Sequence, residues 1–181
     1  MFAKGINLVS EVGIFIGIGG NLSSERFGPP QKTLRAAVAA LPQHGVEPLR
    51  QSRWYRSAPV PASEQPWFVN GVVAVATSLE PAELLCVLHE IENEFGRRRR
   101  RRWEARPLDL DLLDHGGRIE AGTVRLPHPR LHERAFVLLP LKEVAPTWIH
   151  PKSGLSIDQL CARLDPAHKA LPWDEEEDTN T

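Results

Sequence analysis

The sequence predicts an α+β fold in which helices flank an antiparallel sheet. Of the 181 residues, 41% are hydrophobic and 25% are charged, which are ordinary values for a globular chain long enough to bury one core. Strand-like alternation and helix-like periodicity follow one another along the chain in the order β-α-β-β-α-β. These two observations favour a single domain over residues 1–173, followed by an acidic tail over 174–181 that we expect to be disordered.

The first half of the pattern is strand, helix, strand. Residues 13–18 alternate between isoleucines and other residues, so one apolar face of a strand is expected there. A helix is expected from Pro29 to about residue 42, because proline favours a first helical turn and apolar residues then share one stripe. Residues 46–57 predict a second strand, and Pro48 indicates that this strand begins at a sheet edge.

The second half begins with a proline-rich loop over residues 58–66. A third strand is expected over 69–77, apolar enough to be central, and Pro81 opens a helix with an apolar stripe that ends at Gly96. A fourth strand covers residues 107–113. With all six elements in place, the order is that of the split βαβ, or ferredoxin-like, arrangement. Later elements are a short strand near 123–126, a helix over 133–139 and a last helix carrying Ile157, Leu160, Cys161 and Leu164.

Composition excludes several classes of protein. A formal net charge of -1 disfavours a globally cationic nucleic-acid binder. Cys86 and Cys161 are far apart, which excludes a CxxC redox or zinc unit and gives no sign of a disulfide scaffold. The sequence has no signal-peptide core and no apolar run of the ~20 residues that a membrane span needs. We therefore expect a cytoplasmic protein.

The most informative segment is Leu-Asp-Leu-Asp-Leu at residues 108–112. On a strand, Asp109 and Asp111 would share the face opposite the leucines, roughly 6–7 Å apart. Two like charges side by side repel, and hard cations such as a pair of Mg²⁺ ions would compensate them. From these five residues alone, a strand with one solvated acidic face is the simpler interpretation.

Arginines precede this acid pair. Arg97 to Arg102 form an unbroken run and Arg106 follows, immediately before the aspartates. A basic run by itself indicates a solvated loop or a nucleic-acid patch. Beside metal-binding carboxylates, however, guanidinium groups suit a polyphosphate because they bind it bidentately and stabilise the charge of a transferred phosphoryl group. The combination favours Mg-nucleotide chemistry.

Histidines supply further candidates. His128 and His132 have i, i+4 spacing, but prolines on both sides of His128 make a helical zinc pair improbable on steric grounds. A hydrogen bond to phosphate suits His128 better, with Arg134 as a second cation; a surface loop histidine is the alternative. His89 and Glu92 border the buried stripe of the second helix, where an ion pair with an arginine is the simpler interpretation.

Aromatic and amide side chains gather before the third strand. Trp67, Phe68 and Asn70 would suit a flat heteroaromatic ligand, because the amide both donates and accepts hydrogen bonds. Simple core packing is the alternative for Phe68. The glycines at 17, 19 and 20 do not have the spacing of a phosphate-binding loop, and we expect them to allow a tight turn close to other backbone.

Four blocks in this order resemble one family. They are Ile-Gly-Ile-Gly-Gly-Asn-Leu at 16–22, Tyr-Arg-Ser-Ala-Pro-Val at 55–60 with Gln-Pro-Trp-Phe-Val-Asn at 65–70, Ile91-Glu92 through Arg-Pro-Leu-Asp-Leu-Asp at 106–111, and Pro-His-Pro-Arg-Leu at 127–131 with Arg-Ala-Phe at 134–136. The chain resembles the bacterial 6-hydroxymethyl-7,8-dihydropterin pyrophosphokinases of folate biosynthesis. The resemblance spans about residues 12–150.

This resemblance implies a ferredoxin-like enzyme that transfers diphosphate from ATP to the pterin's hydroxymethyl group and releases AMP, with two Mg²⁺ ions as cofactors. It implies no nucleic-acid or membrane partner, and we expect a monomer. The metal ligands would be Asp109 and Asp111. The pterin site would comprise Ser57, Val60, Phe68, Asn70, Trp103 and Phe136.

The resemblance likewise assigns the nucleotide site. It would comprise His89, Glu92, Arg97, Arg99, Trp103, Arg106, Leu112, Arg125, His128 and Arg134. Of these, the catalytic residues would be Arg97, Arg99, Arg106 and His128. The sequence departs from the family at Glu104-Ala105, where Gly-Pro is frequent, and at Gly20, where serine is common.

Two other functions remain open on the sequence. One is a non-enzymatic RNA-binding module that uses the run Arg97 to Arg102, although the third and fourth strands lack the paired aromatic motif that stacks bases. The other is a two-metal phosphohydrolase that would turn over ATP without a pterin.

Overall fold

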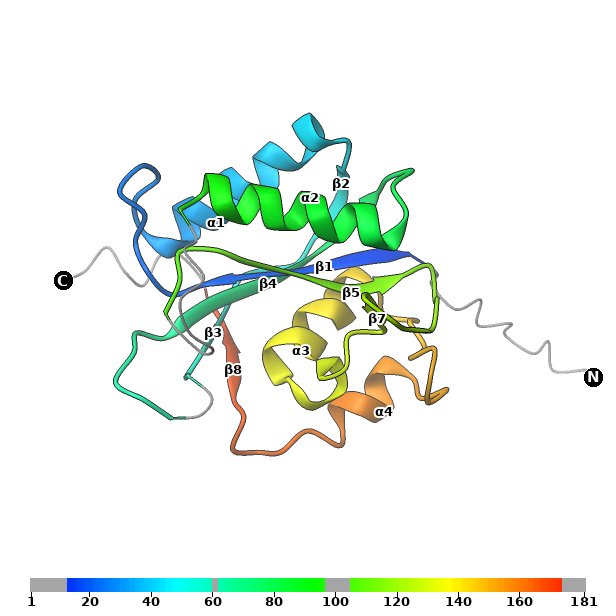
Figure 1. The fold of residues 1–181 in the computed structure, drawn as a ribbon. Coiled ribbons are helices and arrows are strands. Elements are labelled where there is room, and N and C mark those ends of the chain that lie inside the picture. Colours follow the sequence, from blue (N-terminus) through cyan, green and yellow to red (C-terminus); the bar gives the residue numbers. More distant parts are fainter. Residues whose placement is uncertain (1–12, 60–61, 97–104, 174–181) are drawn as a thin grey trace, which may run out of the picture.

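An antiparallel sheet forms the centre of the computed structural model, which describes residues 13–59, 62–96 and 105–173 (Figure 1). Within those ranges the sheet has six strands: β1 (Ile14–Gly20), β2 (Glu47–Gln51), β3 (Tyr55–Ser57), β4 (Phe68–Ala76), β5 (Asp109–His115) and β8 (Ala170–Pro172). The helices are α1 (Pro30–Ala40), α2 (Pro81–Glu94), α3 (Ala135–Val144) and α4 (Ile157–Cys161), with 3-10 turns η1 (Leu41–His44) and η2 (Leu131–Glu133). A small hairpin pairs β6 (Glu120–Ala121) with β7 (Arg125–Leu126).

The strand order confirms the predicted fold. Neighbouring strands run β5-β1-β4-β3-β8, with β2 also paired to β4, and every pairing in this sheet is antiparallel. β2 and β3 are two parts of the second predicted strand. The order β5-β1-β4-(β2, β3) is therefore the split βαβ arrangement that the sequence predicts. Among the strands that the structure describes, β2 pairs with β4 alone, which agrees with the edge position inferred from Pro48.

Several elements differ from the sequence-based expectation, among them β6, which was not predicted, and the last helix, which ends at Cys161 before Leu164. The second strand is broken at residues 52–54, where the Ser52 hydroxyl accepts a hydrogen bond from the Val72 N–H and donates one to the Arg53 carbonyl. The third helix begins at Ala135, because residues 131–133 form a 3-10 turn, and it continues to Val144 rather than ending at residue 139. β8 was not predicted. The tail over 174–181 lies outside the described residues.

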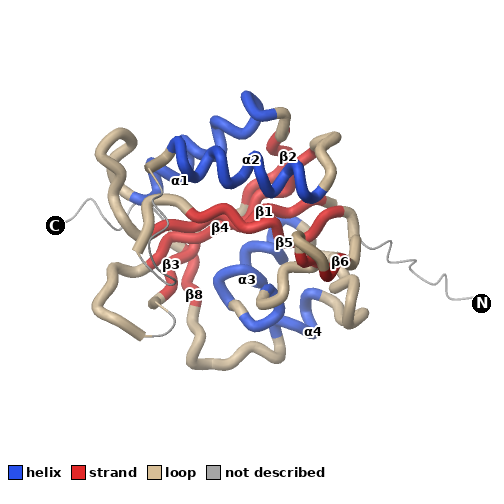
Figure 2. Tube along the Cα trace, in the orientation of Figure 1, coloured by secondary structure: helices blue, strands red, loops and turns tan. Residues whose placement is uncertain are grey.

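Two helical layers cover the sheet. α1 and α2 lie on one face, and α3 and α4 lie on the other (Figures 1 and 2). α2 begins as the sequence predicts, with Pro81 in its first turn and a reciprocal capping box between Glu80 and Glu83. It ends before Gly96, whose φ of +85° favours glycine.

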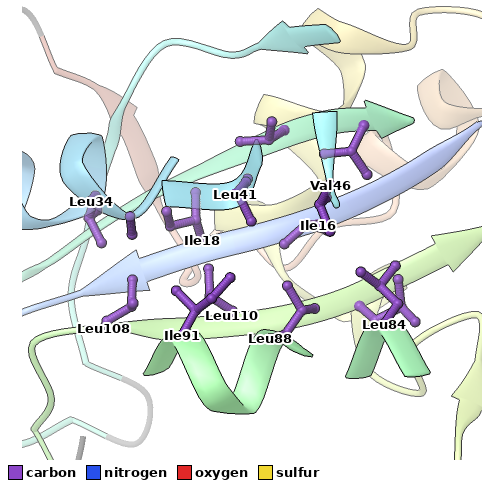
Figure 3. Close-up of a cluster of buried hydrophobic side chains, with 14 of the residues drawn as sticks. Ile16, Ile18, Leu34, Leu41, Val46, Leu84, Leu88, Ile91, Leu108 and Leu110 are labelled. Atoms are coloured by element: carbon purple, nitrogen blue, oxygen red, sulfur yellow. The ribbon is translucent and has the colours of Figure 1, made fainter. Parts of the chain in front are cut away.

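Each layer has its own core. On the α1/α2 face, Figure 3 shows isoleucines of β1 and leucines of β5 packed against apolar side chains of both helices. Phe15, Leu113, Leu138 and Trp148 belong to a second cluster on the α3 face. The β1 and β5 strands thus bury alternate residues on opposite sides, as expected for a sheet with both faces covered. In the part of the chain that the structure describes, no helix is long and apolar enough to cross a membrane.

Candidate active site

A cavity of about 480 Å³ lies on the α3 face of the sheet. Strands β1, β3, β4 and β5 contribute to its lining, and α3 contributes its first turn. The loop after β3, the η2 turn and the segment just before β8 complete the wall. A volume of this size suits small ligands, which proteins usually bind in cavities of roughly 300–1,000 Å³.

Glycines of β1 leave the floor of this cavity open. Gly17 lies directly across from Asp111, and Gly19 lies between Asp109 of β5 and Asn70 of β4. A Cβ atom on Gly19 would come within 2.7 Å of the Asn70 Oδ1 atom. Because β1 places no side chains between its two neighbours here, the carboxylates and the amide border one shared space.

Gly20 explains the expected close backbone approach. A Cβ atom at this position would collide with the carbonyl oxygen of Pro107. The backbone N–H of Asn21 donates to the Arg106 carbonyl oxygen at 2.9 Å immediately afterwards. The close approach predicted for the glycines occurs here, but at the end of a strand rather than in a tight turn.

The acid pair lies where the alternation predicts. Leu108, Leu110 and Leu112 are buried in the core on the α1/α2 face, while Asp109 and Asp111 line the cavity on the opposite face. These five residues therefore contribute leucines to the core and carboxylates to the cavity. A fully solvated acidic face does not describe the pair, because both carboxylates line a cavity and are only partly exposed.

Two arginines accompany the two aspartates inside the cavity. The Arg106 Nη1 atom lies 3.3 Å from Asp109 Oδ1, and the Arg134 Nη1 atom lies 3.6 Å from Asp111 Oδ2. The buried Nε of Arg106 has no hydrogen-bond partner among the described residues. Guanidinium groups in this setting can rotate from carboxylate to phosphate oxygens, which they bind with similar geometry.

The electrostatics favour a bound cation. Burial, reinforced by the negative charge of Asp109 and opposed by Arg134, raises the pKa of Asp111 to about 6. Even so, 39% of the Asp111 side chain remains accessible, and it faces the cavity. A carboxylate pair that repels and is open to a pocket suits a hard cation such as Mg²⁺, which prefers oxygen ligands.

The residues present fit such a cation in one further respect. Among residues 13–59, 62–96 and 105–173, no group of three or more His, Cys, Asp or Glu side chains could hold a metal ion. Mg²⁺ usually takes one or two protein carboxylates and completes its coordination with water and substrate phosphates. Two carboxylates without a third such ligand among the described residues are compatible with this coordination pattern.

The predicted pterin residues that the structure describes come together in this cavity. Ser57, Phe68, Asn70 and Phe136 all contribute to its lining. The Asn70 Nδ2 atom donates a buried hydrogen bond of 2.9 Å to the Ser57 hydroxyl. The Arg134 guanidinium carbon lies 5.5 Å from the centre of the Phe136 ring, so the aromatic wall adjoins the charged part of the site.

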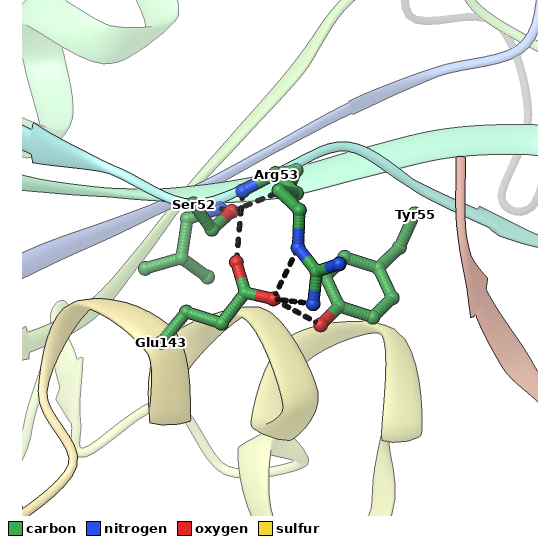
Figure 4. A network of polar contacts seen from close by, with 5 residues as sticks. Ser52, Arg53, Tyr55 and Glu143 are labelled. Carbon is green, nitrogen blue, oxygen red and sulfur yellow. Dashed lines mark hydrogen bonds and ion pairs between the residues drawn. The ribbon is translucent and has the colours of Figure 1, made fainter. Parts of the chain in front are cut away.

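The wall formed by α3 is held against the sheet by a polar network (Figure 4). Glu143 accepts hydrogen bonds from the Arg53 side chain at 2.7 and 2.9 Å and from the Tyr55 hydroxyl at 2.6 Å. Burial and the hydrogen bond to Glu143 raise the pKa of Tyr55 to about 12, so the phenol remains a donor. This network fixes the far end of α3 to β3, two turns beyond Phe136.

The residues predicted for the nucleotide site are more widely spread in the structure than those predicted for the pterin site. Arg106 and Arg134 line the cavity. His128 is not among the residues that line the cavity, although the charges of Arg134 and Asp109 act on its ring. Burial, reinforced by Arg134, lowers the pKa of His128 to about 4, so the ring is neutral near pH 7. Its Nδ1 accepts a hydrogen bond from the Arg130 N–H at 3.2 Å, which leaves the proton on Nε2, available for donation.

Other predicted nucleotide residues do not line the cavity. The buried Glu92 side chain accepts a hydrogen bond from the Leu110 N–H at 2.8 Å, which ties α2 to β5. Leu112 is part of the α1/α2 core, and Arg125 is exposed on β7. His89 lies on α2. The remaining predicted site residues lie outside the described residues, namely Val60, Arg97, Arg99 and Trp103.

Sequence reasoning also missed part of the wall. Ala167, His168 and Lys169 line the cavity just before β8, as do Arg130 and Glu133 from the η2 turn. The segment before β8 carries no motif, so its position could follow only from the pairing of β8 with β3. Trp67, by contrast, does not line the cavity; it is 49% exposed, and the Arg56 guanidinium lies 6.0 Å from its ring centre.

Comparison with known proteins identifies the family. The family model described as 7,8-dihydro-6-hydroxymethylpterin-pyrophosphokinase matches residues 15–146. The chain belongs to this family. It is 43% identical over 155 residues to a 2-amino-4-hydroxy-6-hydroxymethyldihydropteridine pyrophosphokinase of Synechocystis sp., covering 84% of this chain and 76% of that relative. A Bacillus subtilis protein of the same name is 43% identical over 152 residues, covering 83% of this chain and 88% of the relative.

Solved structures support the fold of this pyrophosphokinase. A Plasmodium falciparum HPPK-DHPS matches with a TM-score of 0.64 at 13% sequence identity, over 88% of this chain and 46% of that one. A second HPPK-DHPS, crystallised with substrates, matches with a TM-score of 0.62 over 82% of this chain and 42% of that one. The chain thus spans less than half the length of these structural neighbours. Family membership confirms an enzyme that transfers diphosphate and gives no support to the RNA-binding alternative.

Proposed function

We propose that the cavity binds ATP and 6-hydroxymethyl-7,8-dihydropterin together and transfers the β,γ-diphosphate to the pterin's hydroxymethyl group, as a step of folate biosynthesis. One observation carries the proposal. Asp109 and Asp111 border the same cavity as Ser57, Asn70 and Phe136. A pair of cation-binding carboxylates beside an aromatic and amide slot suits a reaction that joins a phosphate chain to a flat heterocycle.

The pterin would occupy the part of the cavity between β4 and the start of α3. Phe136 and Phe68 supply aromatic surface for the ring. The Asn70 amide nitrogen is engaged by Ser57 at 2.9 Å, and its Oδ1 atom lies over Gly19. That oxygen can accept a hydrogen bond from a ring N–H group, so the slot recognises the polar edge as well as the flat face of the ligand.

The triphosphate would occupy the part that Asp109 and Asp111 border. Mg²⁺ ions held by these carboxylates, two in number on our proposal, would supply neutralising charge to the phosphate oxygens. Arg106 and Arg134 would bind the transferred group, and the Nε2 proton of His128 would be donated to a phosphate oxygen. The ligand-free ion pairs of both arginines then keep these side chains near their working positions.

The chemistry follows from this placement. A bond forms between the pterin hydroxyl oxygen and the β-phosphorus, the bond from that phosphorus to the bridging oxygen of AMP breaks, AMP leaves with that oxygen, and the hydroxyl proton is released to solvent. Most of the rate enhancement would come from positioning and charge stabilisation, and we assign no general base. The monomeric state and the cytoplasmic location remain predictions.

The test is an assay of AMP formation from ATP and Mg²⁺, with and without 6-hydroxymethyl-7,8-dihydropterin. We expect AMP only when the pterin is present, together with an equal amount of pterin diphosphate. Equal turnover of ATP in the absence of pterin would instead indicate a phosphohydrolase. A parallel titration with RNA at several salt concentrations provides the control for non-specific binding by the arginine run.

A further inference from the structure

Asn21 occupies a junction of three chain segments at the rim of the cavity. It follows the last residue of β1 directly, and only 3% of its surface is exposed. The segments that meet it are the end of β1, the end of the loop between β3 and β4, and the residues that precede β5. Asparagine is rarely buried unless its polar atoms are satisfied, so its contacts identify what it holds together.

Both ends of its amide are used, and they hold different segments. The Nδ2 atom donates to the Pro66 carbonyl oxygen at 3.1 Å and to the Gln65 Oε1 atom at 3.3 Å. The Oδ1 atom accepts from the Arg106 N–H at 2.9 Å. The backbone N–H of Asn21 donates to the Arg106 carbonyl oxygen at 2.9 Å. Asn21 therefore forms hydrogen bonds with both the N–H and the carbonyl group of residue 106.

The two segments that Asn21 joins border the two halves of the proposed site. Gln65 lines the cavity at the end of the loop that begins after Ser57, on the pterin side. Arg106 lines it on the phosphate side, with its guanidinium 3.3 Å from Asp109. The single side chain of Asn21 therefore sets where these two segments lie relative to each other.

We infer that Asn21 is a positioning residue for the diphosphate transfer, whose buried amide keeps the pterin loop and Arg106 at a fixed separation. The inference rests on the proposed function. Asn21 touches neither substrate on this account and acts through the backbone of residue 106 and the loop end at residues 65–66. An alanine cannot replace either link.

The experiment compares Asn21→Ala with wild type by steady-state kinetics in ATP and in the pterin. We expect kcat to fall by about 100-fold, because a misplacement of about 1 Å in reacting groups costs a factor of this order. We also expect the KM for the pterin to rise. Thr33→Ala is the control: it also removes a fully buried polar side chain, which lies on α1 on the opposite face of the sheet and forms hydrogen bonds to the Gly28 and Pro29 carbonyls, and it should leave both parameters unchanged.

A double-mutant cycle separates positioning from direct contact. Gln65→Ala removes one of the two hydrogen bonds from Asn21 to the loop end and leaves the one to the Pro66 carbonyl, so it should raise the KM for the pterin less than Asn21→Ala does, with little change in kcat. In the Asn21→Ala background the same substitution should add nothing, because the link is already lost. If Asn21→Ala does not fold, as judged by thermal unfolding, Asn21→Asp still decides the loop link, because it keeps an oxygen to accept from the Arg106 N–H and loses the donor to Gln65 and Pro66; an unchanged KM for the pterin would then contradict the inference.

Three negative outcomes are distinguishable. A wild-type protein that forms no AMP in the presence of the pterin would overturn the proposed function itself. An active wild type together with a folded Asn21→Ala variant of equal kcat and KM would overturn only the role of Asn21. A full additional effect of Gln65→Ala in the Asn21→Ala background would show that Gln65 contacts the pterin directly, which also contradicts the loop link.

Discussion

The two faces of the sheet use the same strands for opposite purposes. On the α1/α2 face, the inward residues of β1 and β5 are buried isoleucines and leucines packed against helices. On the α3 face, Phe15 and Leu113 continue such packing near one end of β1, but glycines replace bulky residues toward the other end. The alternation of side chains therefore lets one strand stabilise the fold and border a binding site at once.

The difference between the faces is one of free energy as well as shape. On the α1/α2 face, which we call the filled face, burial of apolar surface stabilises the fold by about 25 cal/mol per Å². The part of the α3 face that borders the cavity, which we call the hollow face, instead carries the carboxylates of Asp109 and Asp111. The pKa of Asp111 is raised because it is buried beside Asp109. Such a group destabilises the ligand-free protein and is retained where a ligand compensates it. Substitutions on the filled face should therefore change stability, whereas substitutions on the hollow face should change activity.

Asp111→Ala should have the largest effect, and on activity alone. We expect turnover to fall by about a thousandfold or more, because the metal-supported stabilisation of the transferred phosphates amounts to several kcal/mol. The melting temperature should stay the same or rise, since a repelling charge is removed from beside Asp109. Asp158→Ala, which removes a surface ion pair with Lys142 on the same side of the sheet, is the matched control. Near-normal rates in Asp111→Ala would contradict its metal role.

Leu88→Ala tests the filled face and should show the reverse pattern. Leu88 is fully buried on α2, so the substitution should lower the free energy of unfolding by about 2–5 kcal/mol. Denaturant titration measures this loss. Below the melting temperature, kcat and both KM values should match wild type, and a marked change in KM for either substrate would show that the two faces are not independent.

Gly19→Ala should narrow the cavity and have a smaller effect on activity than Asp111→Ala. The added Cβ would lie 2.7 Å from the Asn70 Oδ1 atom, so either the amide or the strand must move. We expect the KM for the pterin to rise by about tenfold, in line with the ~1–3 kcal/mol typical of overpacking. Gly122→Ala is the matched control, because a Cβ there has no atom within 4 Å in the described structure. Equal KM values in both variants would mean that Asn70 does not bind the pterin.

The same comparison shows what the sequence could predict. Period-two alternation in residues 108–112 was enough to place Asp109 and Asp111 on one face, because a strand has only two faces. The break at residues 52–54 could not be predicted, since it depends on the Ser52 hydroxyl reaching the Val72 N–H on another strand.

The missing part of the cavity wall has a similar cause. β8 has only three residues, and its position comes from pairing with β3 across a long separation in sequence. The role of Asn21 is likewise visible only when residues 65, 66 and 106 are brought to it. Local pattern thus predicted the filled face and the acid pair, whereas tertiary contacts determined the rest of the hollow face.

The smallest expected effect is a pH dependence of the stabilisation by Mg²⁺, which arises from Asp111 on the hollow face. The pKa of Asp111 is raised from 3.8 to about 6 in the folded, cation-free protein. The stability contributed by its protonated form is therefore complete below about pH 4 and is lost as the pH rises through about 6. Added Mg²⁺ binds the ionised form, so it should raise the melting temperature more at about pH 7.5 than at about pH 5. Asp111→Asn should abolish this difference, and an equal Mg²⁺ effect at both pH values in wild type would place the cation elsewhere.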